Sequence, residues 1–163
     1  MTVANALTAL RGLLVAPTVV AVLGGRWGAG LGLFLAALVT DVLDGWVARR
    51  SHQVTMLGQL LDPVVDKAFY LALFFSLAAV GRIPYLGVGL FFIPQVGLGV
   101  GALILWHRRR EFTAEWPGKA AAALAAVAAG LLLLTPHGIW AFWVAVGGQF
   151  MAGIYYLVRR TTG

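Results

Sequence analysis

The sequence has no cysteine, few charged residues and few acidic residues in particular. Without cysteine in 163 residues, disulfide bonds and thiolate metal or redox sites are excluded. Charged residues make up 11% of the chain and hydrophobic residues 61%, and the mean hydropathy of +0.89 excludes an ordinary soluble domain. The formal charge of +6 would suit a nucleic-acid-binding protein, but the basic residues cluster at the ends of apolar runs. We therefore attribute the charge to membrane topology and expect no nucleic-acid partner.

Apolar runs recur along the whole chain, each about 18–22 residues long and so able to cross about 30 Å of hydrocarbon. They predict six transmembrane helices, at about residues 5–24, 28–49, 59–80, 84–106, 118–135 and 138–158. The first run has no early basic region and no clear cleavage site, so we expect it to remain in place. The predicted fold class is an all-α integral membrane protein, a six-transmembrane-helix bundle that forms a single domain over residues 1–163.

The distribution of basic residues predicts how these helices cross the bilayer. Ten of the twelve lie on the side that holds both termini and the links after the second and fourth helices. The opposite side holds only Arg26 and Arg82. Because cytoplasmic loops are enriched in lysine and arginine, both termini are expected in the cytoplasm. We therefore expect a multi-pass protein of the plasma membrane with its active site facing the cytoplasm.

Four of the six acidic residues fall within one window, residues 41–67. Asp41 and Asp44 are three positions apart and Asp62 and Asp66 are four apart, so each pair projects from one helix face. Ionisable groups at the edge of a membrane span are costly and mark functional sites. Two helices that each present two carboxylates supply the oxygen ligands that divalent cations prefer. The alternative is that these aspartates cap helices or form ion pairs with neighbouring basic residues, although capping does not require this periodicity.

The aspartate window resembles the signature of the CDP-alcohol phosphatidyltransferases, D-x2-D-G-x2-A-R-x8-G-x3-D-x3-D. Every fixed position of that signature is present, namely Asp41, Asp44, Gly45, Ala48, Arg49, Gly58, Asp62 and Asp66. Residues 5–8 with Arg11, and residues 116–119, are similar to segments of the phosphatidylglycerophosphate synthase branch. The resemblance extends over most of the chain, and the central motif is its specific part.

The resemblance implies transfer of a phosphatidyl group from CDP-diacylglycerol to an alcohol, with release of CMP and with two Mg²⁺ or Mn²⁺ ions as cofactors. It implies that Asp41, Asp44 and Asp62 are metal ligands. Asp66 would be both a ligand and the general base that deprotonates the acceptor. The CDP-binding residues implied are Thr8, Gly45, Ala48, Arg49 and Gly58. The family also implies a homodimer with a polar cavity that opens to the cytosol.

The acceptor half of the site departs from the phosphatidylglycerophosphate synthase pattern. Where that branch carries charged residues in the fourth helix, residues 92–97 of this chain are uncharged, and alanines follow Lys119. The candidate acceptor-binding residues are Lys67, Arg108, Arg109, Arg110 and Lys119. Their alternative roles are topology, headgroup contact and, for Lys67, charge balance with the aspartates. We expect glycerol 3-phosphate as acceptor, with inositol phosphate and phosphatidylglycerol as alternatives.

Two functions from other classes are less consistent with the sequence. A small cation transporter would place its acids near the middle of the membrane and have two related halves, and neither pattern occurs. A catalytically inactive scaffold would not require the complete motif.

Glycines also recur at regular spacing. Gly24, Gly28 and Gly32 are four residues apart, as are Gly97 and Gly101. This small-xxx-small pattern is typical of close helix packing within a membrane protein. A dimer contact on the fourth helix is the alternative interpretation.

Overall fold

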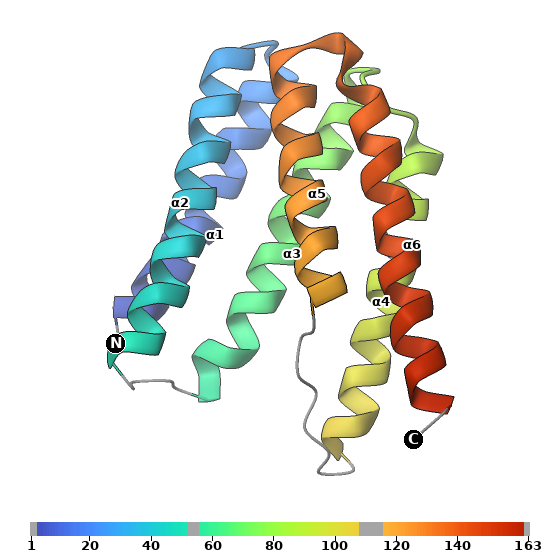
Figure 1. Ribbon diagram of the computed structural model, residues 1–163. Helices are drawn as coiled ribbons and strands as arrows, with labels where there is room; N and C mark the ends of the chain where they lie inside the picture. Colours follow the sequence, from blue (N-terminus) through green and yellow to red (C-terminus); the bar gives the residue numbers. More distant parts are fainter. Residues whose placement is uncertain (1–2, 52–55, 108–115, 162–163) are drawn as a thin grey trace. The chain divides into compact units, whose positions relative to one another are not determined.

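The computed structural model describes the backbone of residues 3–51, 56–107 and 116–161, and the side chains of residues 6–43, 63–97 and 116–159. This part of the chain is helical apart from short turns (Figure 1). Its elements are α1 Val3–Leu23, α2 Trp27–Ser51, α3 Met56–Ala79, α4 Tyr85–His107, α5 Trp116–Leu134, the 3₁₀ helix η1 Pro136–Gly138 and α6 Ile139–Thr161. The predicted all-helical class is confirmed, and each predicted apolar run corresponds to one α-helix.

Several of these helices are suited to a membrane. Within the described residues, three stretches are long and apolar enough to cross a bilayer: Ala6–Leu23, Trp116–Leu134 and Pro136–Arg159. Shorter apolar stretches lie in α2 at Trp27–Leu43 and in α4 at Tyr85–Gly97. The structure therefore supports a membrane protein with several spans, while the crossing of all six helices stays a prediction.

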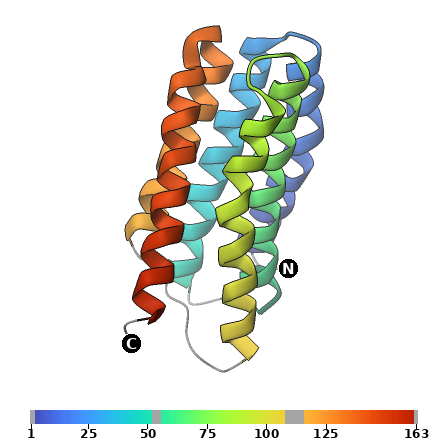
Figure 2. The same ribbon diagram turned by 90° about the vertical axis from the view of Figure 1, so that its right-hand side faces the viewer.

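Contacts between helices divide the chain into two compact units, residues 1–82 and 83–163. In the first unit, α1 packs against both α2 and α3. In the second unit, α6 packs against both α4 and α5, and Figures 1 and 2 show α5 and α6 side by side with opposite directions. Each unit thus has one helix that contacts the other two.

Two glycines end helices of the first unit in the same way. Gly25 and Gly81 have φ angles of 67° and 76°, a left-handed conformation that favours glycine. The amide of the following arginine donates to a carbonyl five residues back, at 2.8 Å after Gly25 and 2.9 Å after Gly81, as in a Schellman motif. The guanidinium carbon of Arg82 lies 3.7 Å from the ring centroid of Trp27. This cation–π contact joins the start of α2 to the turn after α3.

Among the regularly spaced glycines that the structure describes, three show no close helix contact, and Gly24 approaches only carbonyl oxygens of its own helix. A Cβ atom added at Gly28, Gly32 or Gly97 would have no described atom within 4 Å. The close approaches lie elsewhere, because a Cβ atom added at Gly118 would lie 2.9 Å from the hydroxyl oxygen of Tyr156. The spacing of glycines alone is a poor guide in this chain, since packing depends on which face of the helix meets a neighbour.

Gly138 permits the close approach of α6 to α5. This residue is buried in η1, and a Cβ atom added to it would lie 2.6 Å from the carbonyl carbon and oxygen of Leu131. The turn is held by Thr135, whose hydroxyl accepts a hydrogen bond of 3.3 Å from the amide of His137. The tight connection between α5 and α6 therefore requires a residue without a side chain at position 138.

We predict that Gly138→Ala lowers the free energy of unfolding by about 1–3 kcal/mol, the usual cost of overpacking. The measurement is unfolding in mixed micelles, followed by circular dichroism. Gly147→Ala is the control, because a Cβ atom there meets no described atom within 4 Å. In α6 that control is expected to be neutral or to stabilise by up to about 1 kcal/mol. Equal stability of the two variants would contradict the close approach at residue 138.

Candidate active site

The first unit contains an ion pair between a buried arginine of α1 and a partly exposed aspartate of α2. Nη1 of Arg11, on α1, lies 2.9 Å from Oδ1 of Asp41. The side chain of Arg11 is 2% exposed and that of Asp41 is 42% exposed. A guanidinium that is withdrawn from water among apolar helices is costly unless a carboxylate faces it. Arg11 therefore ties α1 to one of the predicted metal ligands and orients its carboxylate.

A carboxylate of α3 faces the same place. Asp41 and Asp66 line one small hollow between α1, α2 and α3, together with Arg11 and Tyr70. The remaining lining is apolar, from Phe34, Ala37, Leu38 and Phe69. The cavity volume is about 10 Å³, room for about one water molecule. One carboxylate from each predicted pair thus opens onto a shared space within this unit.

Tyr70 is a polar residue of this hollow that the sequence analysis missed. It follows Asp66 by four positions on α3, so the two side chains share a helix face. Its ring packs on Phe34 and Phe74, with centroid distances of 6.3 and 5.9 Å. A phenol hydroxyl near carboxylates is a hydrogen-bond donor that can orient them. The spacing of Asp66 and Tyr70 was the available signal, but an aromatic residue in an apolar run is equally typical of a lipid-facing or core position.

The other signature residues lie on the same two helices. Asp44, Gly45, Ala48 and Arg49 belong to α2, and Gly58 and Asp62 to α3, but their side chains lie outside the described part of the chain. Asp44 is three positions after Asp41, and Asp62 four before Asp66. Among the side chains that are described, no group of three or more metal-binding residues occurs.

The predicted substrate-binding residues fall in several places. Thr8 is buried on α1, one turn before Arg11. Lys67 is exposed on α3, next to Asp66. Lys119 is exposed in the first turn of α5, which belongs to the second unit. Residues 108–110 lie outside the described residues, so the structure does not test the predicted acceptor-binding role of the three arginines there.

The donor atoms present are suited to the divalent cations expected from the sequence. Carboxylate oxygens are the hard ligands that Mg²⁺ and Mn²⁺ take, and nitrogen or sulfur donors are not required. Asp41 and Asp66 supply such oxygens from two different helices to one hollow. Arg11 offsets part of their negative charge. The chemistry of these donor atoms therefore fits a small hard cation.

Comparison with known proteins gives the same result as the motif. The sequence model of the CDP-alcohol phosphatidyltransferases matches residues 1–151. A probable phosphatidylglycerophosphate synthase of Mycobacterium tuberculosis is 32% identical over 141 residues, covering 83% of this chain and 67% of that protein. The CDP-diacylglycerol–glycerol-3-phosphate 3-phosphatidyltransferase 2 of Arabidopsis thaliana is 32% identical over 161 residues, covering 80% and 67%. A CMP-forming cardiolipin synthase of Oryza sativa is 53% identical over 45 residues, covering 26% and 14%.

The family match runs through both units and contains the whole aspartate window, whose Asp41 and Asp66 the structure brings to one hollow. Apolar helices of membrane-spanning length surround this polar window in the sequence. The protein therefore belongs to the CDP-alcohol phosphatidyltransferase family, transferases of phospholipid synthesis.

Proposed function

We propose that this enzyme transfers a phosphatidyl group from CDP-diacylglycerol to glycerol 3-phosphate and releases CMP. The observation that carries the proposal is the shared hollow of Asp41 and Asp66, beside the buried guanidinium of Arg11. The acceptor is suggested by two relatives, each aligned to at least 80% of this chain, whose names specify phosphatidylglycerophosphate or glycerol 3-phosphate. The short match to a cardiolipin synthase keeps phosphatidylglycerol as the alternative acceptor.

The four aspartates form the centre of the proposed site. Asp41, Asp44, Asp62 and Asp66 would hold two Mg²⁺ or Mn²⁺ ions, which when bound withdraw charge from the diphosphate. Asp66 also takes the proton of the acceptor hydroxyl as the new oxygen–phosphorus bond forms. The bond that breaks joins the same phosphorus to the phosphate of CMP. Arg11 acts indirectly, as a positioning residue that fixes the carboxylate of Asp41.

The nucleotide would lie along the signature faces of α2 and α3. We propose that Gly45, Ala48 and Gly58 leave room for the cytidine and ribose, because a larger side chain would fill that space. Arg49 would pair with the diphosphate through its planar guanidinium. Thr8 offers a hydroxyl on α1, one turn from Arg11.

The acceptor phosphate would be bound by basic residues. Lys67 lies next to Asp66 and is exposed, so it can approach an anionic acceptor. We also propose Arg108, Arg109, Arg110 and Lys119 for this role, because the sequence places them around the link between α4 and α5. Their positive charge suits a phosphate monoester better than a neutral alcohol.

We further propose that both units act together as one domain, since the family match includes residues of each. The excess of basic residues in the links after α2 and α4 supports cytoplasmic termini and a cytoplasmic active site in the plasma membrane. A homodimer is the assembly that the family resemblance suggests.

We predict that Asp66→Asn slows CMP release from CDP-diacylglycerol by at least about 10²-fold, because the amide cannot accept the acceptor proton. The measurement is CMP formation by purified protein with saturating glycerol 3-phosphate and Mg²⁺. Arg26→Gln, which neutralises an exposed residue of the turn after α1, is the matched control and should keep wild-type activity. A wild-type rate for Asp66→Asn in folded protein would refute the assignment.

We predict that Arg11→Gln destabilises the protein by about 1–3 kcal/mol in EDTA, because the carboxylate of Asp41 loses its charged partner. Millimolar Mg²⁺ should restore part of this loss, since a bound cation supplies positive charge to the same carboxylate. Unfolding in mixed micelles with EDTA or Mg²⁺ measures both values. Arg11→Lys, which keeps the charge but not the planar fork, should lose less. An identical loss with and without Mg²⁺ would show that no cation shares Asp41 with Arg11.

A screen of acceptors against CDP-diacylglycerol tests the proposed substrate. We expect CMP release to be fastest with glycerol 3-phosphate and slower with inositol phosphate or phosphatidylglycerol, because the basic residues favour a compact dianion. The lipid product, identified by mass spectrometry, is the second readout. A faster reaction with phosphatidylglycerol, giving cardiolipin, would replace the proposed acceptor and leave the family chemistry unchanged.

A further inference from the structure

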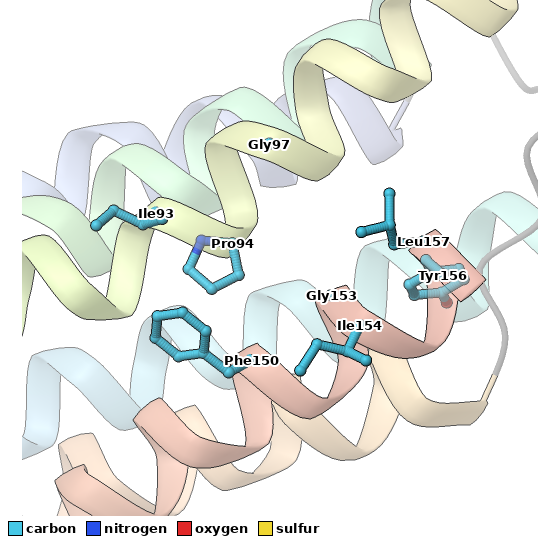
Figure 3. Close-up of a pocket in the computed structure, with 8 residues that line it drawn as sticks. All are labelled: Ile93, Pro94, Gly97, Phe150, Gly153, Ile154, Tyr156 and Leu157. Carbon is cyan, nitrogen blue, oxygen red and sulfur yellow. The ribbon is translucent and has the colours of Figure 1, made fainter. Parts of the chain in front are cut away.

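The second unit contains an open groove between α4 and α6 (Figure 3). It is lined by Ile93, Pro94 and Gly97 of α4 and by Phe150, Ile154 and Leu157 of α6, among others. These α4 residues belong to the uncharged segment 92–97 that departs from the synthase pattern. None of the residues that line the groove is among the proposed catalytic residues of the first unit, so the groove has no role in the proposed chemistry.

The groove exists because the two helices meet at one point and lack side chains beside it. A Cβ atom added at Gly153 would lie 3.3 Å from Cβ of Pro94, so the helices are in contact there. Gly97 follows Pro94 by about one helical turn, and a Cβ atom added to it would meet no described atom within 4 Å. The space that side chains would fill at residue 97 is therefore left open.

The residues that line the groove are suited to binding a hydrocarbon chain. Its lining is apolar except for Tyr156. Ile154 and Leu157 are exposed at its edge, and both belong to the stretch of α6 that is long and apolar enough to span a membrane. The cavity volume is about 280 Å³. An apolar cavity of about 150 Å³ takes one benzene molecule, so this groove has room for about twelve carbon atoms of an alkyl chain.

Positive charge and aromatic rings lie at the end of α6 toward which the groove extends. Arg159 follows Leu157 by two residues, so it lies at the same end of α6 but on another side of the helix. Its Nη1 donates a hydrogen bond of 3.2 Å to the hydroxyl of Tyr155. The ring of Tyr155 lies 6.5 Å from that of Trp116, an exposed residue at the start of α5. Lys119 is exposed in the same turn of α5. Tryptophan, tyrosine and basic side chains together are typical of the headgroup level of a bilayer.

The helices of this unit carry no acidic residue of their own. The sequence has no aspartate or glutamate within α4, α5 or α6, and Glu111 and Glu115 lie between α4 and α5, outside the described residues. The cations at residues 119 and 159 thus complement an anionic headgroup. A second copy of the chain in the same membrane orientation would instead bring like charges together at this level, which opposes a dimer contact at the groove.

We propose that the α4–α6 groove binds one acyl chain of an anionic phospholipid of the surrounding bilayer, with its phosphate at the level of the helix ends where Arg159 and Lys119 lie. The lipid is a resident of the membrane and distinct from the CDP-linked substrate. This inference is independent of the aspartate site, because it rests only on residues of the second unit, and it shares only Lys119 with the proposed acceptor-binding residues.

The test uses purified full-length protein in phosphatidylcholine vesicles that contain phosphatidylglycerol with a photoreactive group in one acyl chain. Labelled peptides are mapped by mass spectrometry. We expect label on residues 93–97 and 150–157, reduced about ten-fold by Gly97→Phe, whose ring excludes several methylene groups from the groove. Gly89→Phe is the matched control, because Gly89 is also an exposed α4 glycine with no described atom within 4 Å of an added Cβ, and it does not line the groove. It should label as the wild type does.

The headgroup part of the proposal has a separate readout. Arg159→Gln should reduce the preference for phosphatidylglycerol over phosphatidylcholine by about five-fold, the usual effect of one basic residue at an anionic surface. Equal labelling of Gly97→Phe and wild type would overturn the proposal. So would complete competition by CDP-diacylglycerol, which would assign the groove to the substrate. A change from dimer to monomer in Gly97→Phe without loss of label would assign it to a second copy.

Discussion

The cost of holding a charged group among apolar helices is the constraint on which this structure depends. Arg11 is almost completely buried on α1, the helix that contacts both α2 and α3, and the carboxylate of Asp41 lies 2.9 Å away. Removing Asp41 would leave the buried guanidinium of Arg11 without its charged partner, which is costly. The ion pair therefore fixes α2 against α1 with the face of Asp41 turned inward. Because Asp66 of α3 lines the same hollow, that one pairing also determines which surface two carboxylates can share.

The polar site and the apolar groove belong to different units of the chain. The first unit has the carboxylates, the buried arginine and a tyrosine in a hollow with little free volume. The second unit has an apolar groove and, at one end of its helices, exposed cations and aromatic rings. A phosphatidyltransferase must handle a diphosphate, which needs charge compensation, and acyl chains, which need apolar surface. The family match includes residues of both units, so each kind of surface belongs to the part of the chain that the family shares.

Much of the fold could be predicted from the sequence because a bilayer constrains helices strongly. The predicted run 118–135 corresponds to α5 Trp116–Leu134, and 59–80 to α3 Met56–Ala79. Glycine and arginine between the apolar runs located the turns at Gly25 and Gly81. The contact of Arg11 with Asp41 could not be derived from the sequence, because it joins two helices whose relative rotation depends on packing. Tyr70 was missed for a related reason: an aromatic residue in an apolar helix has no polar signature until the facing helix is known. Likewise, glycine spacing indicated close packing at Gly28 that the structure does not show.

Binding of Mn²⁺, followed by electron paramagnetic resonance, tests most directly whether Asp41 and Asp66 belong to one cation site. The titration compares wild-type protein with Asp41→Asn and with Asp66→Asn, in the absence of lipid substrate. If the two helices share a cation site, each substitution alone should weaken Mn²⁺ binding by more than about ten-fold, the lower limit for loss of even an outer-shell partner. Unchanged Mn²⁺ affinity in either variant would show that the two carboxylates do not act on the same cation, and would contradict a catalytic centre built across α2 and α3.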